Sequence, residues 1–106
     1  MPEVRINLST TGAYTEPVRV GAAAQVAYQV TSDASFSWAS AVVTMQWTVD
    51  EDESSWIDYP TAQFGVTTAT RGRPRLSIAG VRAIRWRCST SETGADPAAV
   101  LDYLLT

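Results

Sequence analysis

The sequence predicts an all-β protein: a single antiparallel β-sandwich or jelly roll of about eight short strands over residues 1–106. Composition gives the first indication, because 13 Thr, 11 Val and 10 Ser stand against only 5 Leu, and β-branched residues suit a pleated surface. Apolar and polar residues also alternate repeatedly, as they do in strands that bury one face. Turn residues interrupt this alternation at spacings of roughly ten residues, which favours a sandwich over alternating β and α units.

Alternation defines the strands of the N-terminal half. The first three apolar faces consist, in chain order, of Val4, Ile6 and Leu8; of Val18 and Val20; and of Val26, Tyr28 and Val30. A loop at residues 9–13 and a break at Gly21 separate them, and a polar break at residues 31–35 follows the third. The clearest strand runs over residues 42–49, with Met45 and Trp47 on its inward face, and we expect it at the centre of a sheet.

The C-terminal half continues the pattern. An acidic turn at residues 50–55 joins the central strand to a second strand at 56–60, and a short strand at 64–68 follows. Residues 70–74 form a predicted basic turn before a strand at 76–78. The stretch 81–88 is the next strand, with Ile84, Trp86 and Cys88 facing inward and Arg85 and Arg87 facing outward. Residues 98–105 favour a strand, but Asp96 and Pro97 are also a helix start, so a short C-terminal helix is the alternative.

Charged and reactive residues restrict the chemistry. The 106 residues carry 8 Arg, no Lys, no His and 11 acidic residues, for a net charge of −3, so no His-based metal site or acid–base pair can form. The single Cys88 lies at an inward position and is expected to be a core residue. No combination of residues indicates a nucleophile with its base. We therefore expect a protein without enzymatic activity, catalytic residues, metal or cofactor.

Two surfaces are candidate interfaces. Residues 1–60 hold 8 acidic residues and 2 Arg, whereas residues 61–106 hold 3 acidic residues and 6 Arg, so charge is unevenly distributed along the chain. Arg71, Arg73 and Arg75 are expected to pair with carboxylates of a neighbouring subunit, since the acidic chain has no features of a nucleic-acid surface. Phe36 and Trp38 share one face of a polar segment, which is a partner surface or a sugar-stacking platform if exposed and part of the core if not.

The acidic turn allows two interpretations. Its carboxylates could ligate a hard cation, but the spaced ligands and the glycine of a calcium loop are missing, which favours a solvated hairpin tip. No apolar run of about 18 residues and no basic leader is present, so neither a membrane span nor a signal peptide is expected.

The strand Met45–Asp50, its turn and Trp56 resemble the hairpin of discoidin-like, galactose-binding-type jelly rolls, and Gly80–Arg87 is similar to a later strand of that family. This resemblance implies a glycan site with Trp56 as stacking platform and with Asp50 and Asp52 orienting hydroxyl groups. The same combination also resembles small β-sandwich virion proteins of tailed bacteriophages. That likeness implies a capsid decoration, head-fibre or other assembly role.

The leading hypothesis is a structural virion protein that binds and stabilises a phage head lattice as a decoration or cement subunit. Its expected partners are capsid or other virion proteins, with no nucleic acid and no membrane. A homo-oligomer is expected, and a trimer would suit three-fold positions of a capsid. The expected location is the virion, assembled in the bacterial host cytoplasm. The alternatives are a carbohydrate-binding module and a head–tail connector, tail or head-fibre component.

Overall fold

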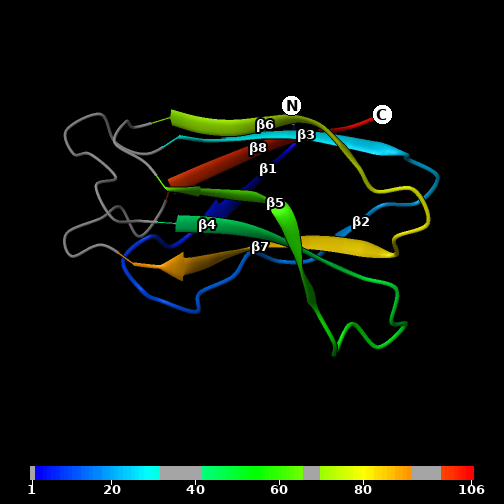
Figure 1. Cartoon of the computed structure of the whole chain (residues 1–106), viewed down its shortest axis with the longest axis horizontal. Coiled ribbons are helices and arrows are strands. Elements are labelled where there is room, and N and C mark those ends of the chain that lie inside the picture. The colour runs from blue at the N-terminus through cyan, green and yellow to red at the C-terminus, as the bar shows by residue number, and fades with distance from the viewer. Residues whose placement is uncertain (1, 32–41, 66–69, 92–98) are drawn as a thin grey trace.

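β-Strands make up the regular structure of this chain. The computed structural model describes the backbone of residues 2–31, 42–65, 70–91 and 99–106. The strands are β1 (Glu3–Ile6), β2 (Val18–Arg19), β3 (Gln25–Thr31), β4 (Val42–Thr48), β5 (Ile57–Gly65), β6 (Thr70–Ser77), β7 (Ala83–Thr90) and β8 (Ala99–Leu105). They form two four-stranded antiparallel sheets packed as a sandwich (Figure 1). The predicted all-β sandwich is therefore confirmed, and no helix that could cross a membrane occurs within those residues.

The strand order is that of a jelly roll. Sheet A has the order β1-β8-β3-β6 and sheet B the order β2-β7-β4-β5. Strand β1 pairs with β8, β2 with β7, β3 with β6 and β4 with β5, so the first half of the chain runs antiparallel to the second. Pairing of β3 with β8 joins the two strand pairs of sheet A, and pairing of β4 with β7 joins those of sheet B. This arrangement is an eight-stranded jelly roll, as the sequence predicts.

The core lies between the sheets and is filled by alternate residues of each strand. The predicted inward positions of β3 and β7 are confirmed, since all of them are buried. Trp86 is at the centre, with ring centroids 5.2 Å from Tyr28 and 5.7 Å from Tyr103. Strand β4 lies inside its sheet, as predicted, between β7 and β5. Its apolar face is buried at Val43 and Met45, half-buried at Trp47 and exposed at Val49, where the chain leaves the sheet.

The predicted basic turn at residues 70–74 is wrong, because these residues belong to β6. Their backbone pairs with β3, with Thr70 opposite Thr31 and Arg73 opposite Tyr28. A shift in the pairing places Pro74 and Arg75 opposite one residue of β3, which is a β-bulge, and Arg75 has a positive φ of 54°. Proline is tolerated there because β6 is an edge strand.

The structure also corrects the prediction for residues 56–68 and decides between strand and helix at the C-terminal segment. The segments predicted at 56–60 and 64–68 belong largely to one strand, β5, which has nine residues and an irregular pairing with β4 near Pro60. Residues 66–69 lie outside the described part. The C-terminal segment is a strand and not a helix. Strand β8 pairs with both β1 and β3, and it buries Ala99 and Leu101 at the period of two that a strand requires.

Candidate functional site

A row of polar side chains crosses the outer face of sheet B, the face turned away from sheet A. Gln46 of β4 stands opposite Arg85 of β7 on one side and Asp58 of β5 on the other. Residues directly opposite in neighbouring strands point to the same face, so these three side chains lie side by side. Together with the rings of Tyr14 and Trp56 they form what we call the aromatic–arginine cluster.

Arg85 holds the cluster together. Its Nε donates to Gln46 Oε1 at 2.8 Å, and Gln46 Nε2 donates to Asp58 Oδ1 at 2.8 Å. The guanidinium carbon of Arg85 lies 4.1 Å from the ring centroid of Tyr14 and 4.4 Å from that of Trp56, so the cation stacks against both rings. Partial burial lowers the pKa of Arg85, but the guanidinium remains charged at neutral pH.

Tyr14 reaches the cluster from the long connection between β1 and β2. Residues 12–15 of this connection run along β7, where Cys88 N donates to Ala13 O at 2.7 Å and Thr15 N donates to Trp86 O at 2.9 Å. The buried Thr15 hydroxyl also accepts a hydrogen bond from Trp86 N at 3.1 Å. This backbone pairing fixes Tyr14 above Arg85, yet 60% of its surface remains exposed.

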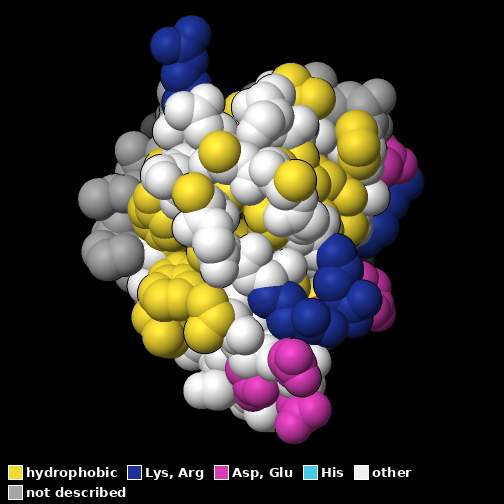
Figure 2. All heavy atoms as spheres, turned by 90° about the vertical axis from the view of Figure 1, so that its right-hand side faces the viewer, with side chains coloured by type: hydrophobic (Ala, Val, Ile, Leu, Met, Phe, Trp, Pro, Cys, Tyr) yellow, Lys and Arg dark blue, Asp and Glu magenta, His cyan; other side chains and the backbone are white. Residues whose placement is uncertain are grey.

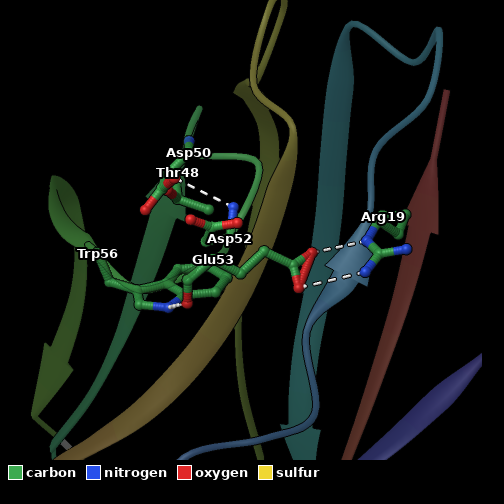
Figure 3. A network of polar contacts seen from close by, with 6 residues as sticks. All are labelled: Arg19, Thr48, Asp50, Asp52, Glu53 and Trp56. Atoms are coloured by element: carbon green, nitrogen blue, oxygen red, sulfur yellow. Dashed lines mark hydrogen bonds and ion pairs between the residues drawn. The ribbon is translucent and has the colours of Figure 1, made fainter.

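Trp56 reaches the cluster from the acidic turn between β4 and β5, and Figure 3 shows this ring beside Glu53 of the turn. Its indole Nε1 donates to the backbone oxygen of Glu53 at 2.8 Å. Glu53 in turn binds Arg19 of β2 through both carboxylate oxygens, at 2.6 Å from Nε and 3.3 Å from Nη2. The turn is thereby attached to both edges of sheet B, since β2 and β5 are the edge strands.

Asp50 organises the acidic turn from within. Its carboxylate accepts hydrogen bonds from Asp52 N at 3.1 Å, from Ser54 N at 3.2 Å and from the Ser54 hydroxyl at 2.7 Å (Figure 3 draws the first). These bonds, the Ser54 hydroxyl first, lower the pKa of Asp50. The hydrogen bond with Arg19 similarly lowers the pKa of Glu53. Both carboxylates are therefore ionised at neutral pH, and their hydrogen bonds hold these negative charges in fixed positions.

Of the residues predicted for a glycan site, Asp50 and Trp56 are already partly occupied by contacts within the protein. Trp56, Asp50 and Asp52 do lie in one turn, but the Asp50 carboxylate is bound by that turn, and Arg85 covers one face of the Trp56 ring. No group of three or more His, Cys, Asp or Glu residues is arranged to hold a metal ion in the part of the chain described.

The predicted interface residues are placed only in part. Arg75 is exposed at the β-bulge of β6. Arg71 and Arg73 belong to the same strand and pair through their backbones with β3, and their side chains lie outside the described part. Phe36 and Trp38 also lie outside the described residues, so neither alternative for them is decided.

Sequence reasoning missed the cluster itself. The alternation of 84–88 correctly places Arg85 on an outward face, and that of 42–48 places Gln46 opposite the apolar face. Nothing in the sequence shows that these residues stand opposite each other, because register between distant strands depends on the fold. Tyr14 lies between the predicted break at 9–13 and the strand at 18–20, and the sequence assigns it no role.

Comparisons with known proteins show a shared fold. No protein-family model matches the chain, and no curated protein matches it. The crystal structure of the SPBc2 prophage-derived protein YomS is similar, with a TM-score of 0.57 and 13% sequence identity over 99% of this chain and 94% of that chain. The two proteins thus share their architecture over nearly their whole lengths, and the name of YomS gives a prophage origin for that protein.

Proposed function

We propose that this chain is a non-enzymatic structural protein of a phage particle that binds an assembled protein lattice as a capsid decoration subunit. The similarity to a prophage-derived jelly roll supports a phage origin. The absence of His and Lys from the sequence agrees with a role in binding. The observation that supports binding most directly is the aromatic–arginine cluster on the outer face of sheet B.

The cluster has the composition and order of a protein interface. Tyr, Trp and Arg are the residues most enriched among those that dominate binding energy. Here Arg85 is fixed between two rings and hydrogen-bonded to Gln46, so a partner need not order these side chains on binding. Tyr14 presents its exposed ring beside them. A partner that covers Tyr14 therefore gains apolar contact at a low cost in side-chain entropy.

Binding of this kind stabilises a capsid by mass action. A subunit that binds only the assembled lattice stabilises it by RT ln(1 + [L]/Kd) per site, about 2.7 kcal/mol at a concentration a hundred times Kd. No cofactor is needed. A trimer of this chain would suit the three-fold positions of the lattice, and closed symmetric oligomers are common among small domains.

Co-sedimentation with particles of the phage that encodes the chain tests this proposal. Tyr14→Ala removes an exposed ring without opening the core, and Leu104→Ala removes an exposed apolar side chain of sheet A as the matched control. We expect wild-type protein and the Leu104 variant to saturate heads, and the Tyr14 variant to bind at least about tenfold more weakly. Failure of the wild-type chain to bind particles would overturn the proposal. Binding to isolated tails but not to heads would move it to a tail or connector role.

Carbohydrate binding is the second candidate, favoured by one observation. The exposed Tyr14 ring lies beside Arg85, which is hydrogen-bonded to Gln46, and a ring next to fixed polar groups can stack on a sugar. A glycan array separates the two candidates. Binding to a defined sugar that is lost in Tyr14→Ala would establish this second function, whereas a protein lattice would bind equally with and without free sugar.

A further inference from the structure

One end of the sandwich carries an apolar pocket, which we call the end pocket. It has a volume of about 320 Å³ and is lined by Trp47, Val49, Tyr59, Ser77, Ala79, Gly80 and Val81. These residues come from β4 and the residue after its end, from β5, from the end of β6 and from the connection between β6 and β7. Figure 2 views this end of the molecule, where hydrophobic side chains are interspersed with other groups and most of the acidic and Arg side chains lie along the right and lower parts.

The fold itself builds the walls of the end pocket. Trp47, Tyr59 and Val81 are partly buried and pack against the core, so their positions depend on the sandwich and not on a ligand. On the side of the β6–β7 connection, Val81 N donates to Ile78 O at 3.1 Å, and Gly80 has a φ of 81°. That is a tight turn which needs glycine at its third position, and it presents the small Ala79 side chain to the pocket.

One side of the end pocket leads into the acidic turn, and the exposed Arg82 follows the lining residue Val81. Val49 is 64% exposed and leads directly into the acidic turn. Glu53 is already bound to Arg19, whereas Glu51 and Asp52 are exposed. A partner that enters the pocket beside this turn therefore meets carboxylates as well as apolar surface.

We propose that the end pocket receives one bulky apolar side chain of the lattice protein, and that an Arg or Lys next to that side chain meets Glu51 and Asp52. This inference rests on the proposed function and identifies the chemistry of its partner. The volume is at the lower limit for cavities that enclose small molecules, and an anchor side chain seated in a preformed pocket is typical of interfaces between proteins. The nearby carboxylates provide charge complementarity, which steers association and fixes orientation.

Filling the end pocket is the first test, again by co-sedimentation with phage heads. Ala79→Phe puts a ring into the pocket from an exposed turn. Ala22→Phe is the matched control, because Ala22 is exposed in another turn and does not line the pocket. Thermal unfolding of both variants checks that the fold is intact. We expect the Ala79 variant to bind at least about tenfold more weakly and the Ala22 variant to bind as the wild type does.

Reversing the charge of the acidic turn is the second test. The double variant Glu51→Lys with Asp52→Lys should weaken binding at low salt and remove most of its salt dependence, because the attraction that salt screens is gone. The control is Glu3→Lys with Glu16→Lys, which makes the same change in net charge at exposed positions outside the turn. We expect this control to retain the salt dependence of the wild type.

These outcomes separate the two proposals. If the wild type binds heads and Ala79→Phe binds equally well with its fold intact, the end pocket is not the contact, while the proposed function stands. Equal effects of the two charge-reversed variants would refute the predicted cation of the partner. A wild-type chain that binds no particle overturns the proposed function, and this inference with it.

Discussion

Replacement of Arg85 tests whether the aromatic–arginine cluster is as ordered as its geometry indicates. Arg85→Met removes two stacking contacts, each worth about 0.5–1 kcal/mol at partly exposed sites. It also removes a hydrogen bond from a charged donor, worth about 1.5–3 kcal/mol, and leaves Gln46 Oε1 without that donor at a residue only 7% exposed. Because such contributions are not additive, we expect a loss of about 2–4 kcal/mol in the free energy of unfolding.

Arg85→Lys makes the test more specific. Lysine keeps the charge and a hydrogen-bond donor, but its ammonium group lacks the planar fork that stacks between two rings while its Nε donates. We expect a loss of about 1–2 kcal/mol for this variant. Urea denaturation followed by circular dichroism measures both variants. Arg87→Met is the matched control, because Arg87 is the next outward Arg of β7, and it should change stability by less than about 0.5 kcal/mol.

Two results would refute this reasoning. If Arg85→Lys is as stable as the wild type, the stacking between Tyr14 and Trp56 contributes nothing to the fold. If Arg87→Met costs as much as Arg85→Met, the loss reflects a general need for positive charge on this sheet face and not the contacts of one side chain.

Three further predictions concern the core and the acidic turn. Trp86→Ala should cost about 3–5 kcal/mol in the free energy of unfolding, measured with urea. Trp86→Phe should cost clearly less, because the buried indole Nε1 has no hydrogen-bond partner among the described residues and its removal regains part of the loss. Equal costs would contradict this. The hydrogen bond with Arg19 lowers the pKa of Glu53, so the ionised Glu53 stabilises the fold above its ordinary pKa of 4.5, and this stabilisation is lost as the pH falls through the lower pKa of the folded state. In Arg19→Gln, the free energy of unfolding should therefore depend less on pH over this acidic range, which unfolding curves measured at several pH values would show. Cys88 is buried, and burial raises the pKa of its thiol, so a thiol reagent should modify it only at the rate of opening or unfolding, and rapid labelling of the native protein would show the assigned strand face to be wrong.

Much of the fold could be predicted from the sequence because burial of one strand face leaves a direct mark on it. The alternation at residues 26–30 and 84–88 predicts inward residues that the structure buries. The segment 70–74 shows the limit of this reasoning. Gly72 and Pro74 are typical turn residues, but pairing with β3 at a sheet edge overrides that local preference, and a bulge accommodates the proline.

The candidate site could not be predicted in the same way, because it depends on register between strands far apart in the chain. Arg85, Gln46 and Asp58 become neighbours only when β7, β4 and β5 pair in one particular alignment. The acidic turn is different, since the Asp50 and Ser54 contacts are local and a hairpin tip is predictable from the residues alone. What remained hidden was its attachment to Arg19, which is 34 residues away in the sequence.

The aromatic–arginine cluster on the outer face of sheet B has one role in the stability of the fold and a proposed role in binding, and different residues separate the two roles. Gln46 is buried and fully engaged between Arg85 and Asp58, so this part of the cluster contributes to the fold. Tyr14 is mostly exposed and its ring stacks on Arg85, so a purely structural cluster would gain little from it. Tyr14→Ala should then weaken particle binding while changing the free energy of unfolding by less than about 1 kcal/mol, the value of one partly exposed cation–π contact. A Tyr14 variant that loses stability as severely as Arg85→Met would assign the whole cluster to folding and leave the end pocket as the remaining candidate surface.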